Sequence, residues 1–304
     1  MPRPDGRHGL AELRELILRH ADNTAYDTPA YTTAVDGLLL GTAVEPMAAR
    51  AGFTEPSVAI VAQGTKRTVL NGTPYDYRAG QFLVVSIGLP VIGAVIEASL
   101  DEPFAVFSLR LRPSVIASLL LETSRRDPTP AFSGLAISDA EPDLIDAAVR
   151  LVRLLDHPED VSVLAAAYER ELTWRLLTGA QGAIVRQIGL ADGSLSQISR
   201  TIQWIRAHFA QPARIEDLAA MAGMSPSSFH RHFRAATSMT PLQFQKQIRL
   251  QEARGLLLAG PADIAEVGHR IGYDSPSQFS REYRRAFGAP PGRDALRLRE
   301  HAAP

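Results

Sequence analysis

The feature that most constrains this chain is a motif that occurs twice in its last third. The first copy, "IEDLAAMAGMSPSSFHRHFRAATSMTPLQF", starts at Ile215, and the second, "IAEVGHRIGYDSPSQFSREYRRAFGAPPGR", starts at Ile264. Aligned with one insertion, Phe229 meets Phe279. Each copy predicts a helix, a glycine-containing turn and a second helix that begins with a serine cap and a proline. This is the layout of a helix-turn-helix unit.

The second helix of each copy has one aromatic face and one polar face. Phe229 and Phe233 lie four residues apart and are expected to point inward, as are Phe279 and Tyr283. An α-helix fits the major groove of DNA, where arginine can donate two hydrogen bonds to guanine and the other side chains can reach further base edges or phosphates. The predicted DNA-contacting residues are Ser227, Ser228, His230, Arg231, Arg234, Ser277, Gln278, Ser280, Arg281 and Arg284.

The segment between the copies, "TPLQFQKQIRLQEARGLLLAG", predicts a helix of roughly 18 residues, which spans nearly 30 Å. That length is close to one turn of B-DNA, about 34 Å. A rigid helix of this length could set both second helices into successive major grooves. The repeat would therefore let one polypeptide contact two adjacent grooves.

Charge supports this interpretation and composition excludes other sites. Residues 1–180 hold 16 Lys+Arg against 23 Asp+Glu, giving −7, whereas residues 181–304 hold 16 against 10, giving +6. The chain has no cysteine, which excludes disulfides, thiolate catalysis and cysteine-ligated zinc, and fits a reducing cytosol. His230 and His232 point to different sides of a helix, so we expect no metal site and no cofactor.

The first two thirds of the chain read as a strand-rich block followed by helices. Residues 30–112 alternate short apolar runs with turn signals, including Asn71-Gly72, a pair that favours a tight hairpin. The charge-free run from Ala79 to Ile96 contains a "GLP" turn and predicts two buried strands rather than a membrane helix. No export signal is recognised at the N-terminus. We expect a small barrel or sandwich and no membrane association.

Helical patterns dominate from Ser114 onward. Two amphipathic helices are predicted near residues 144–155 and 160–177, and with no strand left to cover they are expected to pack against a second subunit. Gly179, Gly182 and Gly193 predict a linker over residues 179–194.

The tandem motif and the connecting segment closely resemble the DNA-binding domain of the AraC/XylS family of bacterial transcription regulators. The resemblance covers residues 195–298, with "RTIQWIRAHFAQPARIEDLAAMAGMS" and "GYDSPSQFSREYRRAFGAPPGR" among its motifs. It implies a seven-helix domain whose third and sixth helices, here Pro226 to Ala236 and Pro276 to Ala286, enter the major groove. Ser227, where other members can have tryptophan, prevents the target sequence from being carried over.

Residues 25–178 resemble the N-terminal domain of one branch of the same family, in features such as "AYERELTWRLLTGAQGA". This implies a cupin-like β-barrel with a small effector, followed by helices that mediate dimerisation. The expected fold class is α+β in two domains, a cupin-like barrel with flanking helices and an all-α tandem helix-turn-helix domain. The expected domains are residues 1–178, with a helical part at 114–178, the linker 179–194, and residues 195–304.

Aromatic and cationic residues of the barrel are the candidates for effector binding, and Arg67 and Arg110 would bind a carboxylate or phosphate. A metallo-cupin needs clustered histidines, and residues 22–156 contain none, so we expect no enzyme. The candidate effector-binding residues are Tyr31, Arg67, Tyr75, Tyr77, Phe82, Phe104, Phe107 and Arg110.

The sequence therefore predicts a cytoplasmic, effector-controlled regulator that binds double-stranded promoter DNA as a homodimer. The sequence does not visibly encode the sign of regulation. An activator would require contact with RNA polymerase, and no stretch identifies that surface. Two alternatives stay open. In one, the N-terminal domain serves only oligomerisation or protein contacts; in the other, an enzyme is fused to a DNA-binding domain.

Overall fold

The structure is a computed structural model that describes residues 6–21, 33–123, 133–190, 193–259 and 263–302. The chain divides into two compact units, Met1–Ser196 and Gln197–Pro304. The first combines sheets and helices, and the second is helical throughout its described residues. This is the α+β, two-domain organisation expected from the sequence.

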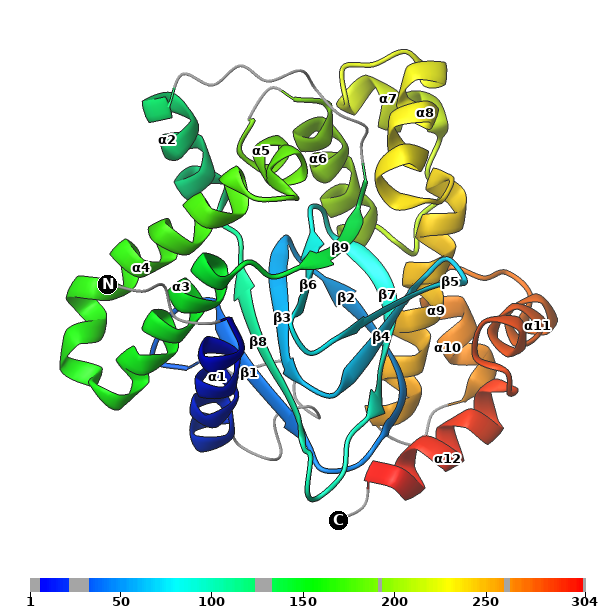
Figure 1. Cartoon of the computed structure of the whole chain (residues 1–304). Coiled ribbons are helices and arrows are strands. Elements are labelled where there is room, and N and C mark those ends of the chain that lie inside the picture. The colour runs from blue at the N-terminus through cyan, green and yellow to red at the C-terminus, as the bar shows by residue number, and fades with distance from the viewer. Residues whose placement is uncertain (1–5, 22–32, 124–132, 191–192, 260–262, 303–304) are drawn as a thin grey trace. The chain divides into compact units, whose positions relative to one another are not determined.

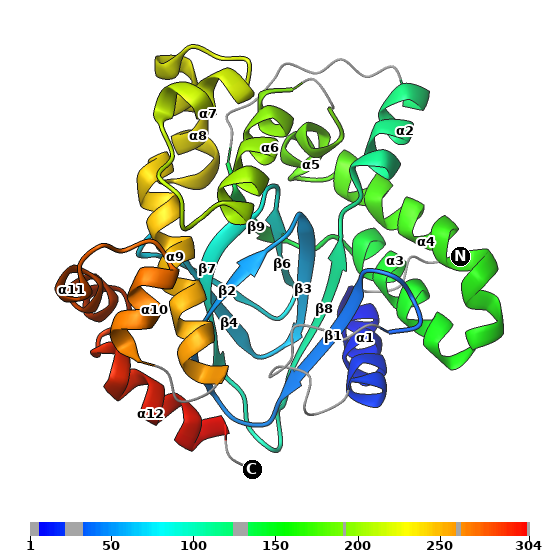
Figure 2. The same ribbon diagram turned by 180° about the vertical axis from the view of Figure 1, so that it is seen from behind.

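Two antiparallel sheets form the centre of the first unit (Figures 1 and 2). In spatial order, the five-stranded sheet contains β1 (Leu38–Ala43), β8 (Phe104–Arg110), β3 (Ser57–Gln63), β6 (Gln81–Val85) and β9 (Leu135–Asp139). The four-stranded sheet contains β2 (Met47–Thr54), β7 (Leu89–Glu97), β4 (Thr65–Leu70) and β5 (Thr73–Arg78). The Asn71-Gly72 turn is confirmed: both residues have positive φ, +49° and +82°, and they join β4 to β5.

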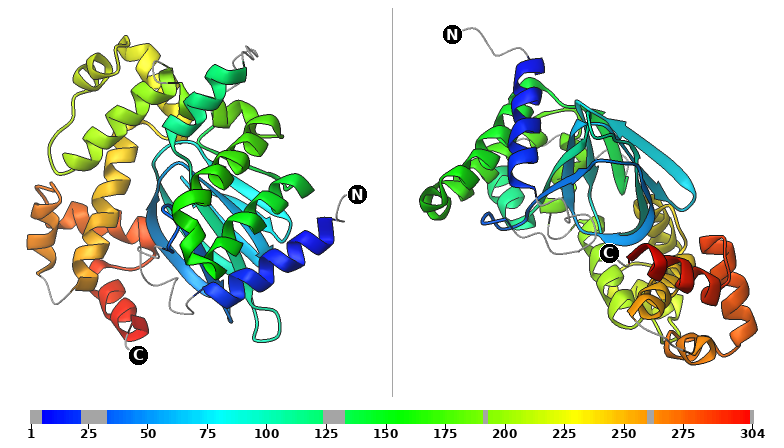
Figure 3. Two further views of the ribbon diagram at one scale, coloured as in Figure 1. Left: turned by 90° about the vertical axis from the view of Figure 1, so that its left-hand side faces the viewer. Right: turned by 90° about the horizontal axis from the view of Figure 1, so that it is seen from below.

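Helices cover the five-stranded sheet on one side (Figure 3). The helices of this unit are α1 (Gly6–His20), α2 (Pro113–Thr123), α3 (Pro142–Arg153), α4 (Pro158–Thr178) and α5 (Gly182–Gly189), with a short 3-10 turn at Leu154–Asp156. α1 contacts β1, β3 and β8, and α3 packs against α1 and α4. The buried face of α3 is therefore covered within the chain.

One expectation for this region was wrong. β9 lies inside the segment expected to be helical, paired with β6 from Gln81↔Asp139 to Val85↔Leu135. A five-residue strand is too short for its periodicity to be separated from a helical turn. Only the partner strand identifies it.

The predicted linker also contains a helix, α5. Val185 and Ile188 are buried in it, and α5 packs against α2. A Cβ on Gly189 would lie 2.5 Å from the Ile116 side chain, and one on Gly182 would lie 2.1 Å from the Leu177 carbonyl oxygen. These glycines permit close packing, so they do not mark the irregular chain that the sequence suggested.

The second unit contains seven helices in its described residues, the number that the family resemblance implied. They are α6 (Ser194–Ala207), α7 (Ile215–Met221), α8 (Pro226–Thr237), α9 (Pro241–Ala259), α10 (Ile264–Arg270), α11 (Pro276–Phe287) and α12 (Pro291–Ala302). The first motif copy supplies α7 and α8, the second supplies α10 and α11, and α9 connects them. Each copy is therefore a helix-turn-helix unit.

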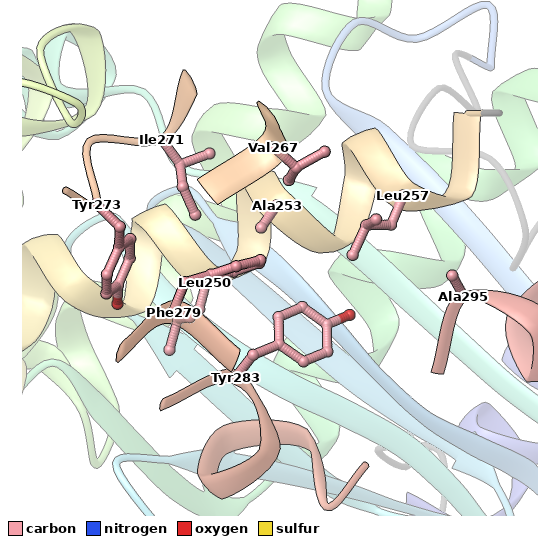
Figure 4. Packing of buried hydrophobic residues seen from close by; sticks show 9 residues of the cluster. All are labelled: Leu250, Ala253, Leu257, Val267, Ile271, Tyr273, Phe279, Tyr283 and Ala295. Carbon is pink, nitrogen blue, oxygen red and sulfur yellow. The ribbon is translucent and has the colours of Figure 1, made fainter. Parts of the chain in front are cut away.

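Aromatic packing holds the second copy against α9 (Figure 4). Leu250, Ala253 and Leu257 on α9 belong to the same buried cluster as Phe279 and Tyr283 on α11. Aromatic packing also holds the first copy against α9. Phe233 packs edge-on against Phe244 of α9, with ring centroids 5.4 Å apart. α9 is thus the common support of both copies.

Candidate DNA-reading helices and candidate effector site

The helices α8 and α11, which we call the reading helices, begin in the same way. Ser225 accepts a hydrogen bond from the backbone N–H of Ser228, and Ser275 accepts one from that of Gln278. A proline follows each serine at the first helical position, where its missing N–H costs nothing. Both helices also end at a residue with positive φ, Ser238 and Gly288. The repeated sequence therefore gives two matched helices.

The turns that precede the reading helices depend on glycine. Gly223 and Gly272 have φ of +64° and +86°, a region that side chains with a Cβ rarely adopt. At Gly272 a Cβ would also lie 2.2 Å from the Ala210 carbonyl oxygen. The positive φ and the lack of room for a Cβ both require glycine at position 272.

The polar face of each reading helix is accessible, as expected. Phe229, Phe233, Phe279 and Tyr283 are all fully buried. Ser228, His230 and Ser280 are half-buried, and the other predicted DNA contacts are exposed, namely Ser227, Arg231, Arg234, Ser277, Gln278, Arg281 and Arg284. The inward and outward assignments are confirmed, and contact with DNA stays a prediction.

His232, a half-buried residue of the first reading helix, follows Arg231 directly in the chain. Burial and the charge of Arg231 both lower the pKa of His232 below its usual 6.5. Both effects disfavour the charged form of this histidine, whereas Arg231 and Arg234 place positive charge on the exposed face.

The second reading helix is anchored to α9 by a carboxylate that sequence reasoning missed. Glu282 accepts hydrogen bonds from the Tyr273 hydroxyl at 2.7 Å and pairs with Lys246 of α9 at 2.8 Å. Glu282 lies three residues after Phe279, on neither the fully buried nor the fully exposed face. No sequence signal distinguished it from a solvated acid.

A second missed residue, Arg249 of α9, bonds to the segment before the first copy and to the turn of the second. Its guanidinium donates to the carbonyl oxygens of Phe209 at 2.6 Å, Ala210 at 3.2 Å and Gln211 at 3.2 Å, before α7. It also donates to the carbonyl of Gly272, in the turn of the second copy, at 2.9 Å. Burial lowers its pKa. One side chain therefore ties together segments that precede both reading helices.

The predicted effector residues do not form one site. Tyr31 lies outside the described residues. Phe82 lines a small hollow with Leu144 and Leu176 of the covering helices, and Phe107 shares its face of the sheet through the register Ile60↔Phe107 and Ile60↔Phe82. These two rings therefore pack under the helices rather than between the sheets.

The two predicted anion-binding arginines already pair with carboxylates at the surface. Arg67 donates two hydrogen bonds of 2.6 Å to Asp76, and Arg110 donates one of 2.9 Å to Asp36. The hydrogen bonds from Arg67, together with its charge, outweigh the opposing effect of burial and hold the pKa of Asp76 below its usual value. Arg67 lies on the opposite face of its sheet from Tyr75 and Tyr77.

Tyr75, Tyr77 and Phe104 have a different placement. Phe104 is on the opposite face of β8 from Phe107, away from the helices. Tyr75 and Tyr77 share the more buried face of the four-stranded sheet with Lys66, because Lys66 pairs with Tyr77 and Thr68 with Tyr75. Counting outward from the Asn71-Gly72 turn would have shown that Lys66 belongs with the tyrosines.

The described part of the chain lacks two other kinds of site. It holds no group of three or more histidine and acidic side chains that could bind a metal ion. None of its helices is both long enough and apolar enough to cross a membrane.

Comparisons with known proteins agree with this architecture. Residues 34–184 match the profile of the AraC-type transcriptional regulator N-terminus, and residues 218–295 match a helix-turn-helix domain profile. The HTH-type transcriptional activator RhaS of Salmonella paratyphi A is 28% identical over 155 residues, which is 48% of this chain and 54% of that protein. RhaS of Enterobacter sp. strain 638 is 27% identical over 154 residues, with the same coverage. The chain thus spans about half the length of the relatives it matches.

Two solved structures share the fold over most of the chain. Unsaturated fatty acid bound ToxT from Vibrio cholerae strain SCE256 has a TM-score of 0.53 at 12% identity, covering 86% of this chain and 95% of that one. ToxT from Vibrio cholerae O395, bound to (E)-4-(8-methylnaphthalen-1-yl)but-3-enoic acid, also has a TM-score of 0.53 at 12% identity, covering 85% and 99%. The expected two-domain fold class is confirmed.

Proposed function

Because the chain belongs to the AraC family of transcriptional regulators, we propose that it regulates transcription by sequence-specific binding to promoter DNA. The observation that carries the proposal is the matched pair of reading helices on one support. α9 has 19 residues. At 1.5 Å per residue its length is about 28 Å, close to the turn of about 34 Å that separates successive major grooves.

The ten outward residues of the reading helices would contact different parts of the DNA. Arg231 and Arg281 are the proposed base contacts, since a guanidinium can donate two hydrogen bonds to the edge of guanine. The serines, Gln278 and His230 would contact other base edges or phosphates, and Arg234 and Arg284 would neutralise the backbone.

The experiment that tests this function is footprinting of the purified protein on DNA upstream of its own gene and of neighbouring genes, over a salt series. Protection of two major-groove segments about one turn apart per subunit is expected. Diffuse protection that disappears with modest salt at every sequence would contradict specific tandem recognition.

The first unit is proposed to bind a small-molecule effector between its sheets. The ToxT structures of similar fold hold organic acids. An effector would shift DNA binding only to the extent that it prefers one arrangement of the protein over another. If instead the first unit serves only oligomerisation, titrations of the full chain with broad metabolite sets would give no saturable heat.

Further proposed partners are a second copy of the chain and RNA polymerase, for an activator acting in the cytoplasm. Val163 on α4 is 74% exposed and Leu121 on α2 is 85% exposed, which supports a partner surface there. Light scattering tests the dimer, and Val163→Arg is expected to shift it toward monomer. The proposed role is regulatory rather than catalytic.

A further inference from the structure

The two reading helices differ in one pair of side chains four residues apart. When the two motif copies are aligned, the first has Ser228 and His232 where the second has Gln278 and Glu282. Residues four apart lie on neighbouring turns of the same helix face. In the second copy the Gln278 amide nitrogen donates to the Glu282 carboxylate at 3.5 Å. The first copy cannot form this pair, because it has neither the amide nor the carboxylate.

Glu282 is held in place by partners outside α11. The hydroxyl of Tyr273, in the turn before α11, donates to Oε2 of Glu282 at 2.7 Å, and the Nζ of Lys246 on α9 lies 2.8 Å from Oε1. Only 18% of the Glu282 side chain is exposed. Burial alone would raise the pKa of Glu282, but hydrogen bonds from Lys246 and Tyr273 outweigh it and lower the pKa. The carboxylate beside Gln278 is therefore a fixed, ionised acceptor.

This carboxylate selects one orientation of the Gln278 amide. A glutamine amide can be turned over, which exchanges its carbonyl oxygen and its nitrogen. Turning it over here would put the carbonyl oxygen, in place of the nitrogen, beside a carboxylate oxygen 3.5 Å away. At that length the hydrogen bond adds little stability, but attraction to the N–H and repulsion of the oxygen still separate the two orientations.

The selected orientation determines what Gln278 presents to solvent. The side chain is exposed, and its carbonyl oxygen accepts no hydrogen bond from the described residues. One of the two amide N–H groups is directed at Glu282, which leaves the second N–H and the carbonyl oxygen available. Gln278 therefore presents one acceptor and one donor on the exposed side of α11.

The bases differ in how they match such a pair. In the major groove adenine offers the N6 amino group as a donor beside the N7 acceptor, whereas guanine offers two acceptors, O6 and N7. An outward carbonyl oxygen with one N–H matches adenine. Against guanine, the same oxygen would face another acceptor and could form no hydrogen bond with it.

We propose that Gln278 contacts adenine in the groove segment bound by the second copy, and that Glu282 is a positioning residue that disfavours guanine there by fixing the Gln278 amide. This inference rests on the proposed function, and it adds the base specificity of one contact. The first copy has no equivalent pair, so the first groove segment does not depend on Glu282 for its base preferences.

Selection from a duplex library randomised over both groove segments, followed by competition titrations with single-base variants, tests the inference. For the full-length wild type, one base pair of the second segment should favour adenine over guanine by about fivefold or more, as a matched pair of hydrogen bonds does. Glu282→Gln should abolish most of that preference, because a neutral amide both donates and accepts and so selects neither orientation. Preferences in the first segment should stay as in the wild type.

A second variant identifies the base pair and separates positioning from stability. Gln278→Met removes both polar groups from an exposed side chain at similar size, and should abolish the adenine preference at the same base pair. In the Gln278→Met protein, adding Glu282→Gln should change no base preference further, because Glu282 acts through Gln278. A role in stability alone would not give this dependence.

The matched control is Glu266→Gln, the same change of charge at an exposed acid on α10 of the second copy. It should keep the wild-type ratio of adenine to guanine binding. Circular dichroism of each variant shows whether it folds. Glu282→His, which introduces the residue that the first copy has at this position, replaces any Glu282→Gln protein that does not fold.

The inference is overturned if no base pair of the second segment prefers adenine, if Glu282→Gln keeps the wild-type preference, or if Glu266→Gln relaxes it as much. Footprints of the wild type separate these results from failure of the proposed function. Intact protection of both segments with any of these results would remove the role of Glu282 alone. Loss of specific protection at every sequence would remove the proposed function and this inference with it.

Discussion

At the scale of single residues, the arginines of the second unit have the same chemistry but different surroundings. Arg231 and Arg281 are exposed on the reading helices. Arg249 donates to four backbone carbonyls, and Arg254 pairs at 3.0 Å with Asp294, a carboxylate with no exposed surface. Tyr283 and Arg297 also donate to Asp294, so its buried charge is compensated. Positive charge therefore serves both recognition and internal structure in this unit.

Arg231→Ala or Arg281→Ala is expected to cost roughly 1 to 3 kcal/mol of binding free energy at the specific operator. Preference at one base pair should relax, because a bidentate contact to one base is lost, while weak binding to other DNA stays. Competition titrations with single-base operator variants measure this. Arg78→Ala, an equal charge loss at an exposed position on β5, is the control. Equal losses on all sequences would mean that the arginines contact only phosphates.

Glu282 gives the second unit a predicted dependence on pH. Burial alone would raise the pKa of Glu282, but hydrogen bonds from Lys246 and Tyr273 outweigh it and hold the pKa below its usual 4.5. A carboxylate with a lowered folded-state pKa stabilises the fold above its unfolded pKa and loses that contribution as pH falls below it. Stabilisation by Glu282 is therefore expected at neutral pH and should decline below pH 4.5.

Urea denaturation of wild type and Glu282→Gln over this pH range checks the prediction. The difference in unfolding free energy between the two proteins should shrink as pH falls. Glu252→Gln, an exposed acid on α9, should show no such trend. A difference that stays constant with pH would assign the effect of Glu282 to packing instead.

At the scale of elements, α9 determines how the two reading helices are held. Phe244 packs against Phe233 of the first copy, and Leu250, Ala253 and Leu257 pack in the core of the second. Gln245 adds hydrogen bonds to the carbonyls of Phe209 and Gln211. One continuous helix therefore contacts both copies. Its Arg249 donates hydrogen bonds to backbone carbonyls before α7 and in the turn of the second copy.

Arg249→Met is expected to lower the unfolding free energy by about 2 to 3 kcal/mol, because hydrogen bonds from a charged donor to several carbonyls are lost. Binding to an operator with both groove segments should weaken more than binding to a half-site with one, since the segment that leads into the first copy and the turn of the second copy lose their shared hydrogen-bond donor. Chemical denaturation and titrations with the two DNA lengths measure these effects.

Arg285→Met, an exposed arginine on α11, is the matched control and should leave stability and the ratio of the two affinities unchanged. If Arg249→Met weakens both DNA lengths equally, Arg249 supports stability without setting the placement of the reading helices.

At the scale of the whole molecule, the two compact units differ in net charge and in proposed function. The acidic part, residues 1–180, has the two sheets, and the basic part has both reading helices. Separate cores indicate that each unit can be stable without the other.

Residues 195–304 expressed alone are therefore expected to melt cooperatively and to give the same footprint positions as the full chain. Circular dichroism and footprinting check this. An unfolded fragment, or one whose footprint is confined to a single groove segment, would show that the first unit is needed for tandem recognition.

Much of the second unit could be predicted from the sequence because its signals are local. Serine caps, proline starts and turn glycines act within four residues, and the spacing of Phe229 and Phe233 determines which face is buried. The family resemblance added the order of the seven helices. The predicted outward residues are accessible, although the side chains that orient the helices, Arg249 and Glu282, were missed.

The sequence by itself determined the tandem helix-turn-helix units, the Asn71-Gly72 hairpin and the change from strands to helices, since each depends on neighbours along the chain. Only the tertiary structure decided that β9 pairs with β6, that α5 packs on α2 through Gly189, and that Lys66 rather than Arg67 shares the more buried face of its sheet with Tyr77. Those features depend on strand register and on contacts between distant segments, and a shift of one residue reverses which side chains face inward.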